Sequence, residues 1–219
     1  MRSNVVADNN AVNVYIMGYA ARMTGDHAYH HGNLRTALLE RAERTVRERG
    51  VHALSLRELA RDAGVSHGAP RRHFPDRDAL LDALAVSGFE RLGAELERAV
   101  AAASRDAGGR LHALARAYVA FATRDPALLE LMFATKHRAG AEHVLAEADR
   151  SLAIALAVIA SAQLDGELVA GDAQQITQFV FATVHGLATM ANGGMLGGED
   201  VAAVVDDAIE RLLAGLRPR

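Results

Sequence analysis

The chain of 219 residues carries 24 Lys and Arg against 27 Asp and Glu, a net charge of −3 at pH 7, and half of its residues are hydrophobic. This hydrophobic content is enough for a packed core in one or two domains. The absence of cysteine excludes disulfides, thiolate catalysis and cysteine-bound zinc. The sequence has neither a run of 18 apolar residues nor a secretion signal, so we expect no membrane span and a cytoplasmic location.

The charge is unevenly distributed along the chain. Residues 27–80 contain ten arginines and seven acidic residues, a net charge of +3, together with six histidines. Residues 81–219 contain twelve basic and eighteen acidic residues, a net charge of −6. A basic N-terminal part on an acidic remainder is typical of a DNA-binding module attached to a part that stays off the DNA.

Residues 1–26 are rich in polar residues, asparagine above all, and show no sustained hydrophobic period. We interpret them as a disordered arm, or as the product of a gene start placed too far upstream, because Met23 lies just before the patterned part of the chain. An arm that enters the DNA minor groove is a third interpretation, but Arg2 and Arg22 are its only basic residues.

The first predicted helix runs from about Asn33 to Arg49. Leu34 and Leu38 begin an apolar stripe at helical spacing, and Gly50 follows the last turn as a stop signal. We expect this helix to pack across the segment that follows it.

The segment Ser55–Phe74, SLRELARDAGVSHGAPRRHF, has the layout of a helix-turn-helix. Ser55 can cap the first helix with its hydroxyl, while Glu58 reaches back to the amide of the cap. An apolar stripe then follows one helix face and ends at Gly64, which can adopt the left-handed conformation favoured after a helix. Ser66 can cap a second, short helix that runs to the end of the segment.

The predicted second helix has the chemistry of a helix that reads DNA. Gly68 and Ala69 lack bulk and allow close approach to a surface, and cationic side chains follow them directly. Entry into a major groove requires close approach together with cations for phosphates or guanine edges. The ordinary alternative is a solvated charged face on a short helix. The predicted DNA contacts are Ser55, Arg57, Ser66, His67, Gly68, Ala69, Arg71, Arg72, His73 and Arg77.

With YHHGNLRTALLERAERTVRERG before it and PDRDALLDAL after it, this segment resembles the tetracycline-repressor (TetR) family of bacterial transcriptional regulators over about residues 29–90. The resemblance implies a three-helix DNA-binding domain. Arg71 departs from the family pattern, because family members usually carry an aromatic residue, commonly tyrosine, at this position. Arginine keeps a phosphate contact available but not the usual stacking.

The remaining patterns predict an all-α chain, since no alternating strand pattern occurs. Asp76 can cap a connecting helix, residues 76–103, that joins a DNA-binding domain, residues 27–75, to a helical domain, residues 76–219. The segment SRDAGGR, residues 104–110, indicates a turn. Further helices are predicted over residues 111–123, 126–137, 142–164, 172–192 and 199–215, the last capped by Glu199 or Asp200.

The last two predicted helices carry stripes that suit an interface between subunits. One consists of small residues after a single aromatic, and the other is apolar. The TetR resemblance implies that this helix pair forms a four-helix bundle with its copy in a second subunit, so we expect a homodimer. From the residues alone, burial of both stripes within one monomer stays open. The stripes are Phe179, Ala182, Gly186, Thr189 and Gly193, and Val201, Val204, Val205, Ala208, Leu212 and Leu216.

A pocket for a small-molecule effector is expected in the helical domain. His185 lies on an otherwise apolar helix, where it is either a core histidine bonded to a backbone carbonyl or a polar group of that pocket. FVFATVHGLATM and PALLELMF resemble the C-terminal domain of a TetR subgroup named for a Trp-His-Gly (WHG) motif, although Val184 replaces the tryptophan. The candidate ligand contacts, otherwise core residues, are Phe121, Met132, Phe133, Phe179, Phe181 and His185.

Enzymatic motifs are absent from the sequence. It contains no nucleophile elbow, phosphate-binding glycine loop, HExxH or paired-carboxylate motif, and its sole lysine, Lys136, has no recognisable Schiff-base context. His27, His30 and His31 lack a carboxylate at ligand spacing, so neither a metal nor a cofactor is expected. A helical enzyme or small-molecule carrier is the alternative from a different class.

We therefore expect a sequence-specific DNA-binding transcriptional regulator. Its expected partners are a double-stranded, pseudo-palindromic DNA operator, a second copy of the chain and a small-molecule effector that releases the operator. This describes a repressor; a transcriptional activator of the same family is the alternative.

Overall fold

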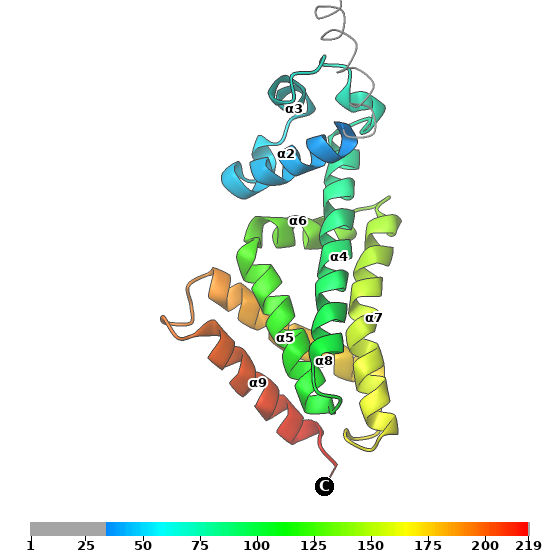
Figure 1. The fold of residues 1–219 in the computed structure, drawn as a ribbon, viewed down its shortest axis with the longest axis vertical. Helices are drawn as coiled ribbons and strands as arrows, with labels where there is room; N and C mark the ends of the chain where they lie inside the picture. The colour runs from blue at the N-terminus through cyan, green and yellow to red at the C-terminus, as the bar shows by residue number, and fades with distance from the viewer. Residues whose placement is uncertain (1–33, 219) are drawn as a thin grey trace, which may run out of the picture.

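The computed structural model describes residues 34–218, and this part of the chain folds into helices without a strand (Figure 1). This result confirms the all-α prediction. The elements are α2 (Leu34–Arg49), η1 (Val51–Ala53), α3 (Leu56–Asp62), η2 (Pro70–Arg72), α4 (Arg77–Ala102), α5 (Ala107–Arg124), α6 (Pro126–Lys136), α7 (Glu142–Leu164), α8 (Ala173–Asn192) and α9 (Val201–Leu216). We call residues 34–76 the head and residues 77–218 the body.

The first two helices of the head form as their local signals indicate. Gly50 ends α2 with φ of 77°, and Gly64 follows α3 with φ of 67°. After α3, the amide of Gly64 donates to the carbonyl of Arg61 and the amide of Val65 donates to that of Ala60, at 3.0 Å each. This pair of bonds satisfies the last carbonyls of the helix and turns the chain toward η2.

The prediction for the second helix of the helix-turn-helix is wrong in the type of helix that forms. Instead of an α-helix over 66–74, the chain makes tight turns and one short 3₁₀ helix, η2. The amides of Ala69 and His73 each bond three residues back, to Ser66 and Pro70, at 3.0 and 2.9 Å. Pro70 has no N–H to donate, and it therefore interrupts the four-residue ladder that an α-helix needs.

The capping box predicted for α3 is also absent. Ser55 occupies the N-cap position with extended backbone, but its side chain makes no capping hydrogen bond. The Glu58 carboxylate lies instead 4.0 Å from guanidinium nitrogens of Arg49 and Arg61. Ion pairing thus replaces the expected bond back to the cap.

α4 connects the head to the body (Figure 1). Asp76 caps it as predicted, accepting from the amide of Ala79 at 2.8 Å. In the body, α5 and α7 pack along α4, while α6 crosses it close to α2. α6 lies close to α4 because Gly88 has no side chain: a Cβ there would lie 2.5 Å from the sulfur of Met132.

The helix predicted from residue 111 begins earlier, at Ala107, so the expected turn over 104–110 is shorter. Asp106 caps the helix by accepting from the amide of Gly109 at 2.8 Å, and the Ala107 amide donates to the Glu167 carboxylate at 2.7 Å. A Cβ at Gly109 would lie 1.8 Å from the Ser104 hydroxyl oxygen. Gly109 thus allows close packing within α5, and it does not end a helix as the sequence suggested.

The later helices agree with their predicted ranges to within two residues, and Asp200 is the cap of α9, accepting from Ala202 at 3.1 Å. None of the helices within residues 34–218 is long and apolar enough to cross a membrane. The predicted arm over 1–26 and the three histidines His27, His30 and His31 lie outside the described residues.

Candidate nucleic-acid interface and buried cavity

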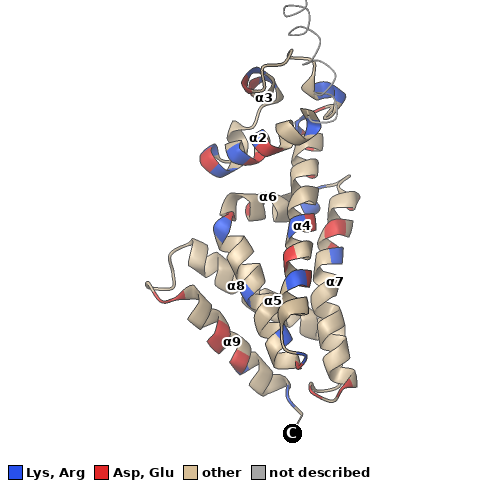
Figure 2. Cartoon of the chain, viewed as in Figure 1, with Lys and Arg blue, Asp and Glu red and all other residues tan. Residues whose placement is uncertain are grey.

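Two arginines project from the tip of the head. Arg71 and Arg72 are exposed on η2 and make no ion pair or side-chain hydrogen bond with any described residue. Pro70 before them and Phe74 after them are buried, and the guanidinium carbon of Arg35 lies 5.4 Å from the Phe74 ring centre. The buried residues hold this short turn in place while its two arginines are exposed. Figure 2 shows that Lys and Arg recur along the backbone of the head.

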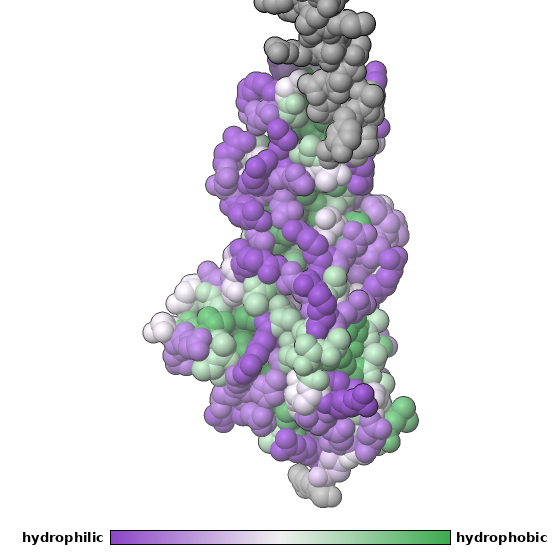
Figure 3. All heavy atoms as spheres, in the orientation of Figure 1, coloured by the Kyte–Doolittle hydropathy of each residue, from purple (hydrophilic) through white to green (hydrophobic). Residues whose placement is uncertain are grey.

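The other predicted DNA contacts lie in the same head, except Arg77, which begins α4. Two of them, Arg57 and His67, line a shallow groove in the head. Three further basic residues line the same groove: Arg49 of α2, His52 of η1 and Arg61 of α3. Arg57, Ser66, His67 and Gly68 are exposed, whereas Ser55, Ala69 and His73 are half-buried. Figure 3 shows that hydrophilic residues dominate this side of the head.

Arg77 has an intramolecular role that the sequence did not reveal. Its guanidinium donates to the carbonyls of Val51 at 2.6 Å and Leu54 at 3.2 Å. These bonds fasten the start of α4 to η1, and they engage donors that we had assigned to a DNA phosphate. The phosphate contact of Arg77 stays a prediction.

A chain of ion pairs joins the head to the body. Glu43 of α2 accepts from Arg47 and from Arg91 of α4, at 3.0 Å each. Arg47 also bonds the buried carboxylate of Asp125, where α5 ends and α6 begins, and this bond raises the pKa of Arg47.

The same chain continues into the body. The Asp125 carboxylate lies 3.7 Å from Arg124, which donates to Glu95 of α4 at 2.8 Å. Two buried nitrogens of Arg91, Nε and one Nη, have no hydrogen-bond partner among the described residues. The third nitrogen of this guanidinium makes the bond to Glu43, so the charge of Arg91 is paired through one nitrogen only.

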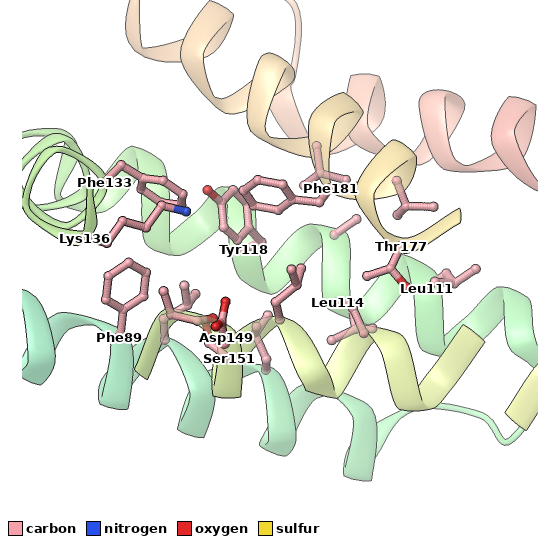
Figure 4. A pocket seen from close by; sticks show the side chains of 18 residues that line it. Phe89, Leu111, Leu114, Tyr118, Phe133, Lys136, Asp149, Ser151, Thr177 and Phe181 are labelled. Carbon is pink, nitrogen blue, oxygen red and sulfur yellow. The ribbon is translucent and has the colours of Figure 1, made fainter. Parts of the chain in front are cut away.

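The body contains a cavity of about 90 Å³, partly open to solvent, between α4, α5, α6, α7 and α8 (Figure 4). This is several times the ~10–15 Å³ that one water molecule needs. Its wall is apolar apart from a few side chains, which is the usual character of a small-molecule site. The polar lining residues are Tyr118, Lys136, Asp149, Ser151 and Thr177.

Only part of the predicted ligand set meets at this cavity. Phe133 and Phe181 line it. Phe121 and Met132 are fully buried but pack elsewhere in the core, Phe121 beneath Arg124 and Met132 against Gly88. These two residues are core residues, which is the alternative given for them, and their contact with a ligand stays a prediction.

Phe179 was assigned to the wrong face of α8. It is 59 % exposed, whereas Phe181 lines the cavity. Two helical residues at this spacing are about 200° apart around the axis, so they face opposite sides.

His185 is bonded to a side chain and not to a backbone carbonyl. Its Nδ1 shares a 2.7 Å hydrogen bond with the hydroxyl of Tyr118. The ring also lies 4.8 Å from Phe133 and 5.4 Å from Phe181, centre to centre. Burial lowers the pKa of His185, and the nearby Lys136 lowers it further. His185 therefore stands behind the wall and supports Tyr118, which lines the cavity.

Lys136 and Asp149 are cavity residues that sequence reasoning missed. The Lys136 nitrogen lies 4.3 Å from the Phe133 ring centre, and burial lowers the pKa of this lysine more strongly than Asp149 raises it. The spacing of three between Phe133 and Lys136 places both on one helix face. That spacing was the available signal, but only the packed structure shows which face meets a cavity.

A helix-turn-helix head with exposed cations, joined by one helix to a helical body with a cavity between its helices, defines the class of helix-turn-helix transcriptional regulators. Two family models match the chain: "Bacterial regulatory proteins, tetR family" over residues 38–84 and "Tetracyclin repressor-like, C-terminal domain" over residues 111–216. The chain belongs to the TetR family of DNA-binding bacterial transcriptional regulators.

The chain is also similar to individual proteins. HTH-type transcriptional regulator BetI of Yersinia pestis is 35% identical over 82 residues, which are 37% of this chain and 41% of BetI, so the match spans less than half of that relative. A protein of unknown function from Rhodococcus sp. RHA1 is 50% identical, with a TM-score of 0.84 over 88% of this chain and all of that one. The TetR regulator PfmR of Thermus thermophilus shares the fold at 20% identity, with a TM-score of 0.65 over 83% and 99% of the two chains.

Proposed function

We propose that the chain is a sequence-specific repressor that binds a pseudo-palindromic operator as a homodimer and is released by a small molecule in the body cavity. The observation that carries the proposal is the pair of outward arginines on η2, which have no partner among the described residues and are held between buried Pro70 and Phe74. Cations in this position suit contacts to phosphates and guanine edges. Activation of transcription instead of repression is the second candidate within the family.

The proposed dimer uses α8 and α9. Phe179 and Met190 of α8 are 59 and 40 % exposed in the single chain, and Met195 after α8 is 60 % exposed. Hydrophobic atoms also gather at the surface of the body in Figure 3. Exposed apolar residues at helical spacing favour burial by a partner. A two-fold dimer would place two heads about 34–36 Å apart, one turn of DNA.

The proposed release follows from the place of α6. This helix carries Phe133 and Lys136 of the cavity wall and packs against α2 and α4. Its N-terminal residue follows Asp125, which bonds Arg47 of the head. An effector that binds the DNA-incompetent arrangement 100-fold more tightly shifts the equilibrium by at most ~2.7 kcal/mol, which is enough to regulate.

We also propose that the body belongs with the WHG subgroup. The support is the position of His185, which holds Tyr118 at the cavity wall.

A mobility-shift titration on the DNA upstream of the gene tests operator binding. The wild-type chain is expected to bind one fragment specifically. The double variant Arg71→Ala/Arg72→Ala is expected to bind that fragment at least about tenfold more weakly, because a guanine-contacting arginine contributes ~1–3 kcal/mol. A matched control is Arg98→Ala, which removes an exposed arginine from the body end of α4 and should bind like wild type. Binding that ignores sequence, or an unchanged double variant, would contradict the proposal.

A further inference from the structure

Within the described residues, the cavity has one polar side chain whose donors are free. The hydroxyl of Tyr118 is bonded to His185, that of Ser151 donates to the carbonyl of Ala148 at 2.7 Å, and that of Thr177 donates to the carbonyl of Ala173 at 2.7 Å. Lys136 has no hydrogen bond or ion pair with any described residue. An ammonium carries three donors and a positive charge, so it is the group of this wall that most needs a partner.

Lys136 lies at one end of an elongated apolar wall. Figure 4 shows its side chain along Phe133 with the nitrogen directed inward, toward Tyr118. Leu111, Leu114 and Thr177 line the opposite end of the cavity in the same view. A ligand that fills both ends must therefore be apolar over most of its length and polar at one end.

We propose that the effector is an apolar molecule with a single anionic headgroup, such as a carboxylate, bound with the headgroup at Lys136 and the apolar part toward Leu111 and Leu114. This inference rests on the proposed role of the cavity as the effector site. The chemistry is a charge-assisted hydrogen bond beside an apolar wall, and such a bond is stronger than one between neutral groups.

The aromatic side chains around Lys136 do not favour a cationic ligand. Rings such as those of Phe133 and Phe181 can hold a cation, but the ammonium of Lys136 already lies over Phe133. A second cation would be repelled by it. Asp149 is exposed to solvent, so water screens its charge, although it weakens the attraction for an anion.

Three probes with the same eight-carbon chain separate the possible headgroups: octanoate, 1-octanol and octyltrimethylammonium. We expect calorimetric titration of the full chain to give the tightest binding for octanoate. Lys136→Met keeps the apolar stem but loses the charge, and should weaken octanoate about tenfold while changing octanol less than about twofold. Asp149→Asn should tighten octanoate. Arg150→Met removes a neighbouring charge from α7 and is the matched control, because that side chain is 71% exposed and paired with Glu147.

A second measurement uses the wild-type chain, so its outcome does not depend on whether a variant folds. Lys136 is the sole lysine of the chain, so ¹³C reductive methylation labels one side chain besides the N-terminal amine. Octanoate should shift the Lys136 methyl signal and leave the N-terminal signal in place. Octanol should shift the Lys136 signal less than octanoate does.

The outcomes separate this inference from the function on which it rests. Octanol or the cation binding as tightly as octanoate, or no response of the lysine signal, would overturn the anionic headgroup but leave the cavity as a site. No binding of any probe would overturn both. Operator mobility shifts with saturating octanoate test release, and unchanged DNA affinity there would contradict the regulatory role while the binding chemistry stands.

Discussion

Tyr118, Lys136 and His185 bring three titratable side chains to one part of the body, and burial shifts each of them toward its neutral form. It raises the pKa of the Tyr118 hydroxyl and lowers those of the lysine and the histidine. The short bond between Tyr118 and His185 thus joins two neutral groups at neutral pH. At this scale, one half-buried histidine links protein stability to pH.

Acid should weaken the fold through His185. Because its pKa is lowered in the folded chain, the unfolded chain takes up a proton near pH 6.5 that the folded chain does not, so stability falls as pH drops below about 6.5 toward the folded pKa. We expect His185→Gln to reduce the difference in urea midpoint between pH 7.5 and pH 5.5, measured at one protein concentration.

His137→Gln, at an exposed histidine after α6, is the control and should keep the wild-type difference. The same pH difference in His185→Gln as in wild type would rule out this histidine as the cause.

Single residues also mark where sequence reasoning stopped. Asp76 and Asp200 could be identified as caps because a cap depends on the two or three residues after it. Phe121, Phe179 and Phe181 are alike in the sequence, and only the packing of five helices decides which of them meets the cavity. Lys136 was missed because its significance arises from the wall around it.

At the scale of elements, the helices of the body could be predicted almost completely, whereas η2 could not. Apolar spacing and turn signals delimit α7 from Glu142 to Leu164 without reference to the rest of the molecule. The segment around Pro70 carries two opposing signals, a cap before it and a proline within it. Its outcome, a 3₁₀ turn, depends on the burial of Pro70 and Phe74 against the head.

The outer face of α8 allows a sharp test of the dimer. A Cβ at Gly186 would meet no described atom within 4 Å, and replacing this glycine by a better helix former should favour the helix by roughly 1 kcal/mol. In the proposed interface the same side chain would separate the two subunits. We expect Gly186→Leu to be monomeric at micromolar concentration by light scattering, with unchanged helical circular dichroism.

Ala157→Leu, on the exposed side of α7, is the control and should remain dimeric. A dimeric Gly186→Leu would place the interface elsewhere, and a monomeric wild-type chain would remove it.

At the scale of the whole molecule, α4 and the ion pairs around Glu43 and Asp125 fix the orientation of the head relative to the body. Arg47 connects these two carboxylates, so a shift of the α5–α6 corner reaches α2 directly. The basic head could be recognised from the distribution of charge along the sequence. The bond between Arg47 of the head and Asp125 at the α5–α6 corner could not be recognised from the sequence, because these residues are 78 positions apart.

DNase I footprinting of the full chain on the DNA upstream of its gene tests the central claim most directly. We expect a protected pseudo-palindrome whose two half-sites are about 10–10.5 base pairs apart, centre to centre, because two heads related by a two-fold axis enter successive major grooves. Protection of a single asymmetric site, or no site-specific protection, would contradict it.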